Sequence, residues 1–310
     1  MRVIFCGNPE FALPSLEAIV SASYEVPAVI TSPDRPKGRG LKLRAPAVKQ
    51  KALELGLRVL QPSKLKEQGF LTEVKSLNAE IMVIVAFRVL PPELFTLPSR
   101  GAFNLHASLL PRYRGAAPIN WAIINGETET GLTTFFLKRK VDTGDTILQR
   151  RVEIEEEETS GELSQRLSHL GAELVVDTLK LLQSGEVKTT PQDEGMATRA
   201  PKIVKEHCRI DWSKKAEEVK NLIRGLSPLP GAYTHFRGKT LKLYRSQPSG
   251  DLKLRGQPGE VLLSSPKEGM TIACGEASLW LQELQLEGKR AISGQEFVRG
   301  YRVEVGEVLG

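Results

Sequence analysis

The chain has 310 residues, enough for two domains, and its 40% hydrophobic and 26% charged residues are ordinary globular values that exclude a disordered protein. The longest apolar runs are too short to span a membrane, the N-terminal apolar run is too short for a signal peptide, and three cysteines without paired spacing exclude a disulfide scaffold, so we expect a cytoplasmic protein. The net charge of +6 identifies no partner by itself.

The first half of the chain alternates short apolar runs with segments of helical spacing. The predicted strands are Arg2–Cys6, Val26–Thr31, Arg58–Gln61, Ile81–Ala86, Gly101–His106, Thr133–Leu137 and Thr146–Ile154. The predicted helices are Phe11–Val20, Ala47–Leu55, Leu65–Leu77 and a long helix through Leu182 that Thr159 or Ser160 would cap. Strands alternating with helices predict an α/β domain with a Rossmann-like, mostly parallel sheet covered on both faces.

The pattern changes after the long helix. Periodicity stops around Gly185–Ile203, a stretch that predicts an extended linker. One helix, Ala216–Ile223, then precedes five short strand candidates, which predict a small OB-like β-barrel. These candidates are Ala232–Phe236, Thr240–Arg245, Gly259–Leu263, Met270–Ala273 and Leu279–Gln285. We therefore predict a catalytic domain over residues 1–186, a linker over 187–204 and an OB-like domain over 205–310.

The charged residues are unevenly placed. The segment Asp34–Lys51 carries seven basic residues and one acid, and Lys205–Arg255 carries twelve basic residues and five acids. An acidic stretch, Glu153–Glu158, has five glutamates in six residues. One such cluster usually marks a solvated surface, but two basic segments favour a polyanionic partner such as a nucleic acid, with a phosphorylated metabolite as the alternative.

A polar pair at the end of the predicted strand Gly101–His106 can carry chemistry. Asn104 and His106 are two residues apart, so their side chains share one face of the strand, at the end where open α/β sheets bind ligands. A hydrogen bond from His106 to a backbone carbonyl explains the pair equally well. Further along, Asp142 lies in the turn Val141–Asp145, where its carboxylate would orient His106 if the fold brought them together, although the turn composition alone also explains it.

Several common sites are excluded by spacing. The four histidines include no pair with metal-ligand spacing, so we expect no metal. The sequence also lacks a phosphate-binding P-loop, a dinucleotide-binding glycine fingerprint and the glycine–serine elbow of hydrolases.

The residues 104–121, NLHASLLPRYRGAAPINW, together with Val141-Asp142-Thr143-Gly144-Asp145, resemble the folate-dependent formyltransferase family. Three further stretches resemble the branch of that family that formylates methionyl-tRNA, rather than the branches that act on glycinamide ribonucleotide, formyltetrahydrofolate or amino sugars. They are Gly7–Ala12, the basic loop Thr31–Gly40, and Asp211-Trp212 with Asn221–Ala232. The resemblance covers nearly the whole chain.

The resemblance implies formyl transfer from 10-formyltetrahydrofolate to the α-amino group of methionine on charged initiator tRNA, without a metal. It implies that Asn104, His106 and Asp142 are catalytic and that Ser108, Leu109, Leu110 and Pro111 shape the folate site. The implied tRNA-binding residues are Arg35, Lys37, Arg39, Lys42 and Arg44, aided by the OB-like domain. We expect a monomer that does not bind membranes.

Two alternatives remain open at this point, and the chain departs from the family pattern in places. One alternative is an enzyme that formylates a small amine such as an amino-sugar nucleotide, and the other is a non-catalytic RNA-binding protein on the same scaffold. Leu229 stands where tryptophan is more usual, His207-Cys208 interrupts another segment, and Phe87-Arg88 replaces a Tyr-Gly pair in the loop of the folate pocket.

Overall fold

The computed structural model describes residues 1–37, 42–249 and 256–310, without the side chains of Lys37 and Lys42. By internal contacts these residues divide into two units. The first unit comprises residues 1–115, 130–152 and 164–200, and the second comprises 116–129, 153–163 and 201–310. Each unit therefore draws on segments that lie far apart in the sequence. The predicted domain boundaries at 186 and 204 stay a prediction.

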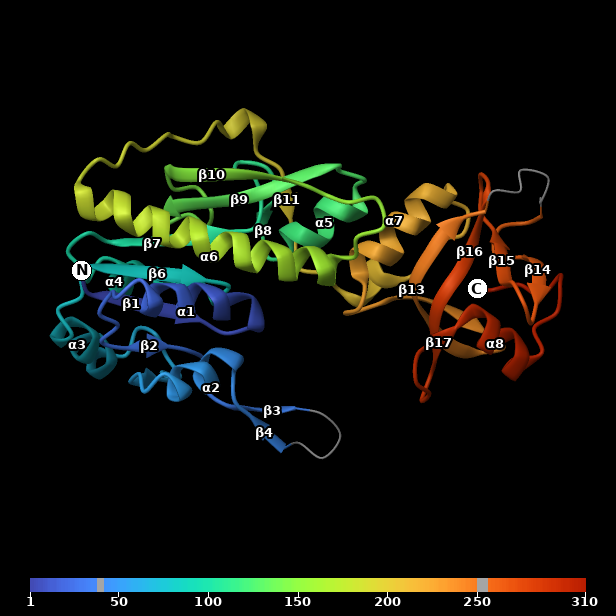
Figure 1. Cartoon of the computed structure of the whole chain (residues 1–310), viewed down its shortest axis with the longest axis horizontal. Coiled ribbons are helices and arrows are strands. Elements are labelled where there is room, and N and C mark those ends of the chain that lie inside the picture. Colours follow the sequence, from blue (N-terminus) through green and yellow to red (C-terminus); the bar gives the residue numbers. More distant parts are fainter. Residues whose placement is uncertain (38–41, 250–255) are drawn as a thin grey trace. The chain divides into compact units, whose positions relative to one another are not determined.

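The first unit is built on a seven-stranded sheet with helices on both of its faces (Figure 1). Its strand order is β10-β9-β7-β6-β1-β2-β5. The strands are β1 (Val3–Gly7), β2 (Val29–Ile30), β5 (Val59–Leu60), β6 (Ile81–Val85), β7 (Ala102–His106), β9 (Glu129–Phe136) and β10 (Thr146–Glu153). The five strands from β5 to β7 run parallel, and β9 runs antiparallel to β7. The predicted Rossmann-like, mostly parallel sheet is confirmed.

Four helices of the first half follow predicted segments: α1 (Leu13–Ser21), α2 (Ala47–Glu54), α3 (Gln68–Ser76) and α6 (Ser160–Ser184). A short helix, α4 (Pro92–Phe95), was not predicted. As expected, Thr159 caps α6, because its hydroxyl accepts from the amide of Glu162 while the Glu162 carboxylate accepts from the amide of Thr159. Both β1 and β6 are fully buried, which explains why their sequences are unbroken apolar runs.

The face of β7 that carries Leu105 is covered by α6. A Cβ atom added to Gly171 of α6 would lie 2.6 Å from Leu105 Cδ2, so the helix approaches the strand closely there. About two turns further along α6, the hydroxyl group of Thr178 forms a 2.8 Å hydrogen bond with the hydroxyl group of Thr134 of β9. Because side chains alternate along a strand, Asn104 and His106 project from the opposite face of β7.

The second unit contains an antiparallel sheet in the order β12-β13-β16-β15-β14, with β17 paired to β16. Its strands are β12 (Ala232–Phe236), β13 (Lys239–Pro248), β14 (Val261–Ser265), β15 (Gly269–Ala273), β16 (Ser278–Leu286) and β17 (Ile292–Ser293). Its helices are α5 (Pro118–Ile124), α7 (Ala216–Leu226) and α8 (Gly294–Tyr301). This confirms the predicted C-terminal antiparallel β domain.

The acidic stretch of the sequence has a structural role in the second unit. Lys220 of α7 is almost fully buried, and its ammonium group lies 2.8 Å from a carboxylate oxygen of Glu157 and 3.5 Å from one of Glu156. The neighbouring Arg224 donates to the backbone carbonyls of Glu155 and Glu158. A buried cation requires such partners, so these contacts hold residues 153–163 within the second unit.

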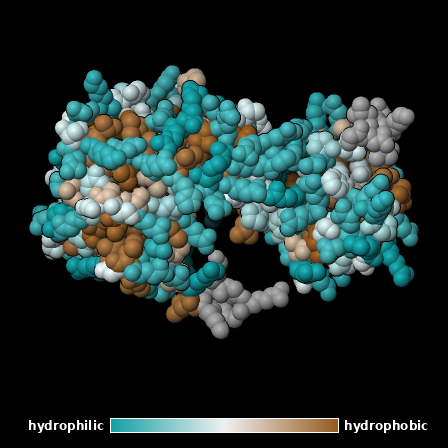
Figure 2. All heavy atoms as spheres, viewed as in Figure 1, coloured by the Kyte–Doolittle hydropathy of each residue, from teal (hydrophilic) through white to brown (hydrophobic). Residues whose placement is uncertain are grey.

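Hydrophilic side chains predominate on the face of the molecule shown in Figure 2, and the hydrophobic ones form small groups. Single exposed apolar side chains occur at Leu43, Val89 and Leu229. None of the helices in residues 1–37, 42–249 and 256–310 has the length and apolar character needed to cross a membrane.

Candidate active site

The carboxyl end of β7 places His106 and Asn104 at one edge of the first unit's sheet. His106 is 6% exposed, and its Nε2 lies 2.9 Å from the backbone carbonyl of Tyr113. This is the carbonyl contact that the sequence left open as an alternative to catalysis. This contact orients the ring through Nε2 and leaves Nδ1 available to a second partner. Asn104 is half-buried, and no hydrogen bond of its side-chain amide is found within the described residues.

That second partner is Asp142, which is distant in sequence. Asp142 Oδ2 lies 4.0 Å from His106 Nδ1, and both side chains are largely buried. The same oxygen accepts a 2.9 Å hydrogen bond from the backbone amide of Gly115. The backbone of Asp142 is left-handed, with φ of 56°, which is uncommon for a residue other than glycine. The fold therefore brings together the two residues that the sequence could not connect.

The loop after β7 is held by hydrogen bonds within the first unit. Ser108 is fully buried and its hydroxyl donates to the carbonyl of Arg112, while Thr133 of β9 donates to the carbonyl of Ser108. The hydroxyl oxygen of Thr133 also accepts a 3.1 Å hydrogen bond from the backbone amide of Leu110, and the Leu110 side chain is buried. Leu109 and Pro111 are half-buried. Hydrogen bonds and burial therefore fix the segment Ser108–Pro111 next to His106, and we call this segment the wall.

Residues 190–200, which lie within the predicted linker, form a strap across this loop. Its strand β11 (Arg199–Ala200) pairs with β8 (Arg114–Gly115). Thr198 accepts from the amide of Tyr113 at 2.8 Å. Gln192 contacts both Arg114 and the turn that carries Asp142. Composition gave no sign of these roles, because the polar residues of the strap are those of any loop.

The side chains at this edge suit the transfer of a group between two substrates. An amide donor at Asn104 can stabilise an oxyanion, and an imidazole next to a carboxylate can move a proton. Within the part of the chain that the structure describes, no cluster of His, Cys, Asp and Glu has the arrangement of a metal site.

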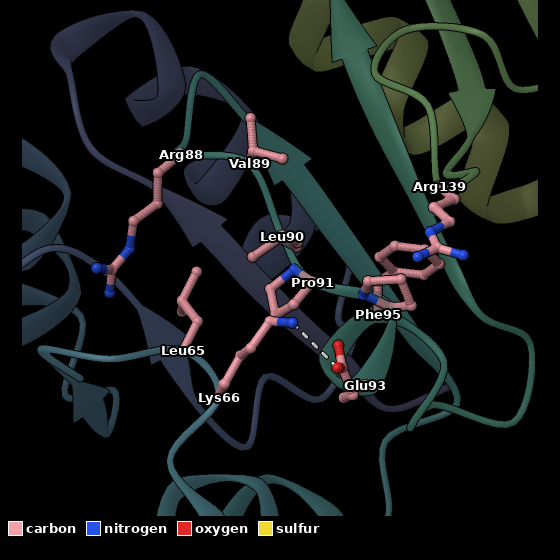
Figure 3. A pocket seen from close by; sticks show the side chains of 10 residues that line it. Leu65, Lys66, Arg88, Val89, Leu90, Pro91, Glu93, Phe95 and Arg139 are labelled. Carbon is pink, nitrogen blue, oxygen red and sulfur yellow. Dashed lines mark hydrogen bonds and ion pairs between the residues drawn. The ribbon is translucent and has the colours of Figure 1, made fainter.

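An open pocket of about 840 Å³ lies at the same edge of the sheet, after β6. Figure 3 shows its lining, which combines apolar side chains with three cations, Lys66, Arg88 and Arg139. Glu93 forms a 3.1 Å ion pair with Lys66, and its own backbone amide and Lys66 lower the pKa of its carboxyl group. Burial, and then the nearby charge of Arg35, lower the pKa of Arg88. None of Ser108–Pro111 lines this pocket.

The basic segment of the first unit forms a hairpin in its described part. Strands β3 (Arg35–Lys37) and β4 (Lys42–Arg44) pair antiparallel, with Arg35 directly opposite Arg44. Both arginines are exposed. Like charges at directly opposite positions weaken a strand pair, and an anionic ligand would remove that penalty. Arg39 lies outside the described residues.

The base of this hairpin is anchored to the sheet. Asp34 accepts hydrogen bonds from Gln61 and Lys49, which lower the pKa of its carboxyl group in that order of size. Asn8, in the turn after β1, accepts from the hydroxyl of Thr31 and the amide of Ser32. The stretches Gly7–Ala12 and Thr31–Gly40, which both carry the family resemblance, therefore contact one another.

The mostly parallel sheet and the antiparallel second unit define a protein that joins an α/β unit to an antiparallel β unit, with a polar pair, His106 and Asp142, at the carboxyl end of the parallel strands. Residues 1–179 match the formyl transferase family and residues 202–302 match the formyl transferase C-terminal domain. The chain therefore belongs to the formyl transferase family, and it is a formyl-transferring enzyme. The resemblance found in the sequence is confirmed.

Relatives of high identity match along their whole length. The chain is 47% identical over 311 residues to the methionyl-tRNA formyltransferase of Geobacter sulfurreducens, covering 100% of this chain and 97% of the relative. It is 45% identical to the methionyl-tRNA formyltransferase of Caldanaerobacter subterraneus, covering 100% of both chains.

Solved structures of low identity share the fold. HypX from Aquifex aeolicus, in complex with tetrahydrofolic acid, has a TM-score of 0.69 at 19% identity and covers 99% of this chain and 48% of its own. A methionyl-tRNA formyltransferase from Clostridium thermocellum has a TM-score of 0.59 at 17% identity and covers 81% of this chain and 95% of its own.

Proposed function

We propose that this enzyme transfers the formyl group of 10-formyltetrahydrofolate to the α-amino group of methionine carried by initiator tRNA, for the start of translation. The observation that carries the proposal is the full-length match to methionyl-tRNA formyltransferases at 43–47% identity. The geometry at the end of β7 agrees with it, because Asn104, His106 and Asp142 are the types of residue that acyl transfer to an amine requires.

In this reaction the amine attacks the formyl carbon, and the formyl oxygen becomes negatively charged. The bond from the formyl carbon to N10 of the donor then breaks, and tetrahydrofolate leaves with a proton at N10 that balances the one lost by the amine. Asn104 donates a hydrogen bond to that oxygen, and His106 lies beside it on the same face of β7. Asp142 orients the imidazole of His106 and helps to remove the proton from the attacking amine. A positioned oxyanion donor is typically worth about 10²–10³ in rate, and acid–base assistance about 10²–10⁴.

The direct test is a product assay. The protein is incubated with 10-formyltetrahydrofolate and either initiator tRNA charged with methionine or free methionine. N-formylmethionine attached to tRNA, with none formed from free methionine, is the expected result. Formylation of an amino-sugar nucleotide instead of the charged tRNA would refute the proposed acceptor.

The donor is assigned to the wall Ser108–Pro111 and to the open pocket after β6. The apolar lining of the pocket suits the flat pterin and benzoyl rings of a folate. Its cations Lys66, Arg88 and Arg139 suit the carboxylates of the folate tail. Arg88 therefore gives this chain a charge where the family pattern has glycine.

Bulk introduced into the donor site is expected to weaken donor binding selectively. Val89 lines the pocket and is 69% exposed, so Val89→Trp can fill the pocket without disturbing the core. We expect the KM for 10-formyltetrahydrofolate to rise about tenfold or more, equivalent to roughly 1.4 kcal/mol, with the KM for tRNA unchanged. Steady-state kinetics with each substrate varied measures both values.

Two further variants make this experiment decisive. Leu53 of α2 is 58% exposed and lies outside the pocket, so Leu53→Trp is the matched control. Leu109→Trp tests the wall in the same way. An effect of Leu109→Trp alone would confine the donor to the wall, and a larger change in the KM for tRNA than for the donor would transfer that residue to the tRNA site.

The basic segment from Arg35 to Arg44 is assigned to the phosphates of the acceptor stem of tRNA, through Arg35, Lys37, Arg39, Lys42 and Arg44. The exposed and mutually opposed Arg35 and Arg44 support this assignment. RNA helices are bound mainly through shape and phosphates, which suits long cationic side chains. The C-terminal domain, with its basic segment from Lys205, would hold the body of the tRNA.

Loss of a phosphate contact changes the salt dependence of binding in a predictable way. Arg44→Ala is expected to weaken tRNA binding and to reduce the slope of log affinity against log salt by about 1. Arg58→Ala is the matched control, because Arg58 is also exposed but already paired with Glu73. Equal slopes for parent, Arg44→Ala and Arg58→Ala would exclude Arg44 from the tRNA contact.

We also propose that the chain is a monomer, that its two domains divide at residues 186 and 204, and that it works in the cytoplasm with the translation machinery. Size-exclusion chromatography with light scattering tests the monomer, and separate expression of 205–310 tests the boundary.

A further inference from the structure

Gln192 lies in the strap of residues 190–200, and every donor and acceptor position of its side-chain amide is hydrogen-bonded within the first unit. Its Nε2 donates to the backbone carbonyl of Asp142 at 3.0 Å and to that of Gly144 at 2.7 Å. Its Oε1 accepts from Nε and Nη2 of Arg114 at 3.1 and 2.7 Å. Both hydrogens and both lone pairs of the amide are therefore used, which is the full capacity of a glutamine side chain.

The first pair of contacts supports the turn that carries Asp142. The backbone of Asp142 is left-handed, with φ of 56°, and such a conformation depends on support from the surrounding structure. Gln192 bonds to the carbonyl of Asp142 itself and to the carbonyl two residues further on. It thereby restrains the peptide group that directly follows Asp142 and the one that follows Gly144 in the same turn.

The second pair of contacts reaches the loop that supports His106. Arg114 lies between Tyr113, whose carbonyl contacts His106 Nε2, and Gly115, whose amide donates to Asp142 Oδ2. Gln192 therefore joins the support of the imidazole to the support of the carboxylate. The 4.0 Å separation of His106 and Asp142 depends on both.

We propose that Gln192 is a positioning residue that sets the orientation of Asp142 toward His106, a role that rests on the proposed function of that pair. An amide is required chemically, because the two carbonyls need a donor and the guanidinium needs an acceptor. A glutamate at this position would serve Arg114 but would face two carbonyl oxygens with its own charge. A methionine of similar length would serve neither side.

The experiment compares Gln192→Met and Gln192→Glu with the parent enzyme. We expect both to lower kcat by roughly 10²-fold, since a misplacement of about 1 Å can have that effect, while the KM for charged tRNA stays within about twofold. If Gln192→Glu kept the parent kcat while Gln192→Met lost it, Gln192 would act through Arg114 alone and the proposal would be overturned.

Glu194→Gln is the matched control in the same strap. Glu194 is 61% exposed and forms a 2.9 Å ion pair with Arg114. It also forms a 3.3 Å ion pair with the exposed Lys140, directly before the turn, but among the described residues it has no hydrogen bond to Asp142 or Gly144. We expect this variant to keep at least half of the parent kcat.

A double-mutant cycle separates positioning from general loss of folded protein. In an Asp142→Ala background, Gln192→Met should lower the residual rate by less than about twofold, because groups that act as one unit are not additive. A further loss of roughly 10²-fold in that background would show that Gln192 acts independently of Asp142 and would overturn the proposal.

A spectroscopic measurement is independent of the reaction. The imidazole ¹⁵N resonances of His106, assigned by comparison with His106→Ala, should move in Gln192→Met and stay in place in Glu194→Gln. Unmoved resonances in Gln192→Met would overturn this proposal without bearing on the function. Absence of formylation by the parent would instead refute the proposed function.

Discussion

Replacement of His106 by alanine is expected to lower the kcat of formylation by about 10²–10⁴-fold, the usual contribution of a positioned acid–base group. The imidazole is nearly buried, bonded to the carbonyl of Tyr113 and 4.0 Å from Asp142. Water that enters the vacated space cannot carry a proton in the same fixed geometry. The single-turnover rate with charged initiator tRNA measures the loss directly.

Asn104→Ala is expected to lower kcat by about 10²–10³-fold, as the loss of one oxyanion donor does. Both variants should keep the parent affinity for tRNA. His169→Ala is the matched control, because His169 is exposed on α6, the helix that covers the face of β7 opposite to Asn104 and His106. A rate near the parent value for His106→Ala or Asn104→Ala, in folded protein, would remove that residue from the mechanism.

Gly144→Ala is expected to abolish most of the activity by displacing the turn that carries Asp142. A Cβ atom on Gly144 would lie 1.5 Å from the backbone oxygen of Phe136. Because the obstacle is the backbone of β9, no side-chain rotation can relieve the clash, and the turn itself must move. We expect kcat to fall by roughly 10²-fold and the free energy of unfolding by about 1–3 kcal/mol.

Gly69→Ala provides the contrasting case in the same unit. Gly69 lies in α3, and nothing is found within 4 Å of an added Cβ atom. An alanine there should raise the free energy of unfolding by up to about 1 kcal/mol and leave kcat unchanged. Thermal unfolding and kinetics of the two alanine variants test the contrast. Parent-like kcat in Gly144→Ala would show that Asp142 tolerates movement of its turn and would contradict its assigned role.

Elements with a strong local signal were predicted correctly. The buried strands β1 and β6 are continuous apolar runs, and their burial on both faces is the reason for that pattern. The hairpin of β3 and β4 was predicted as a loop, and helices α4, α5 and α8 were not predicted. Helix α5 has seven residues and α8 has eight, too few for a clear helical period. Helix α8 nevertheless had a readable signal, since Ser293 and Glu296 form a capping box at its start.

The sequence by itself determined the family, the pair Asn104 and His106 on one strand face, and the alternation that leads to the parallel sheet. These features depend on neighbours in the chain, and a strand places residues two apart on the same side. Only the tertiary structure decided that Asp142 lies beside His106, that Gln192 contacts both Arg114 and the turn that carries Asp142, and that residues 116–129 and 153–163 belong to the second unit. Those contacts join residues dozens of positions apart. Their formation depends on packing and buried charge pairs such as Lys220 with Glu157, which no local pattern in the sequence records.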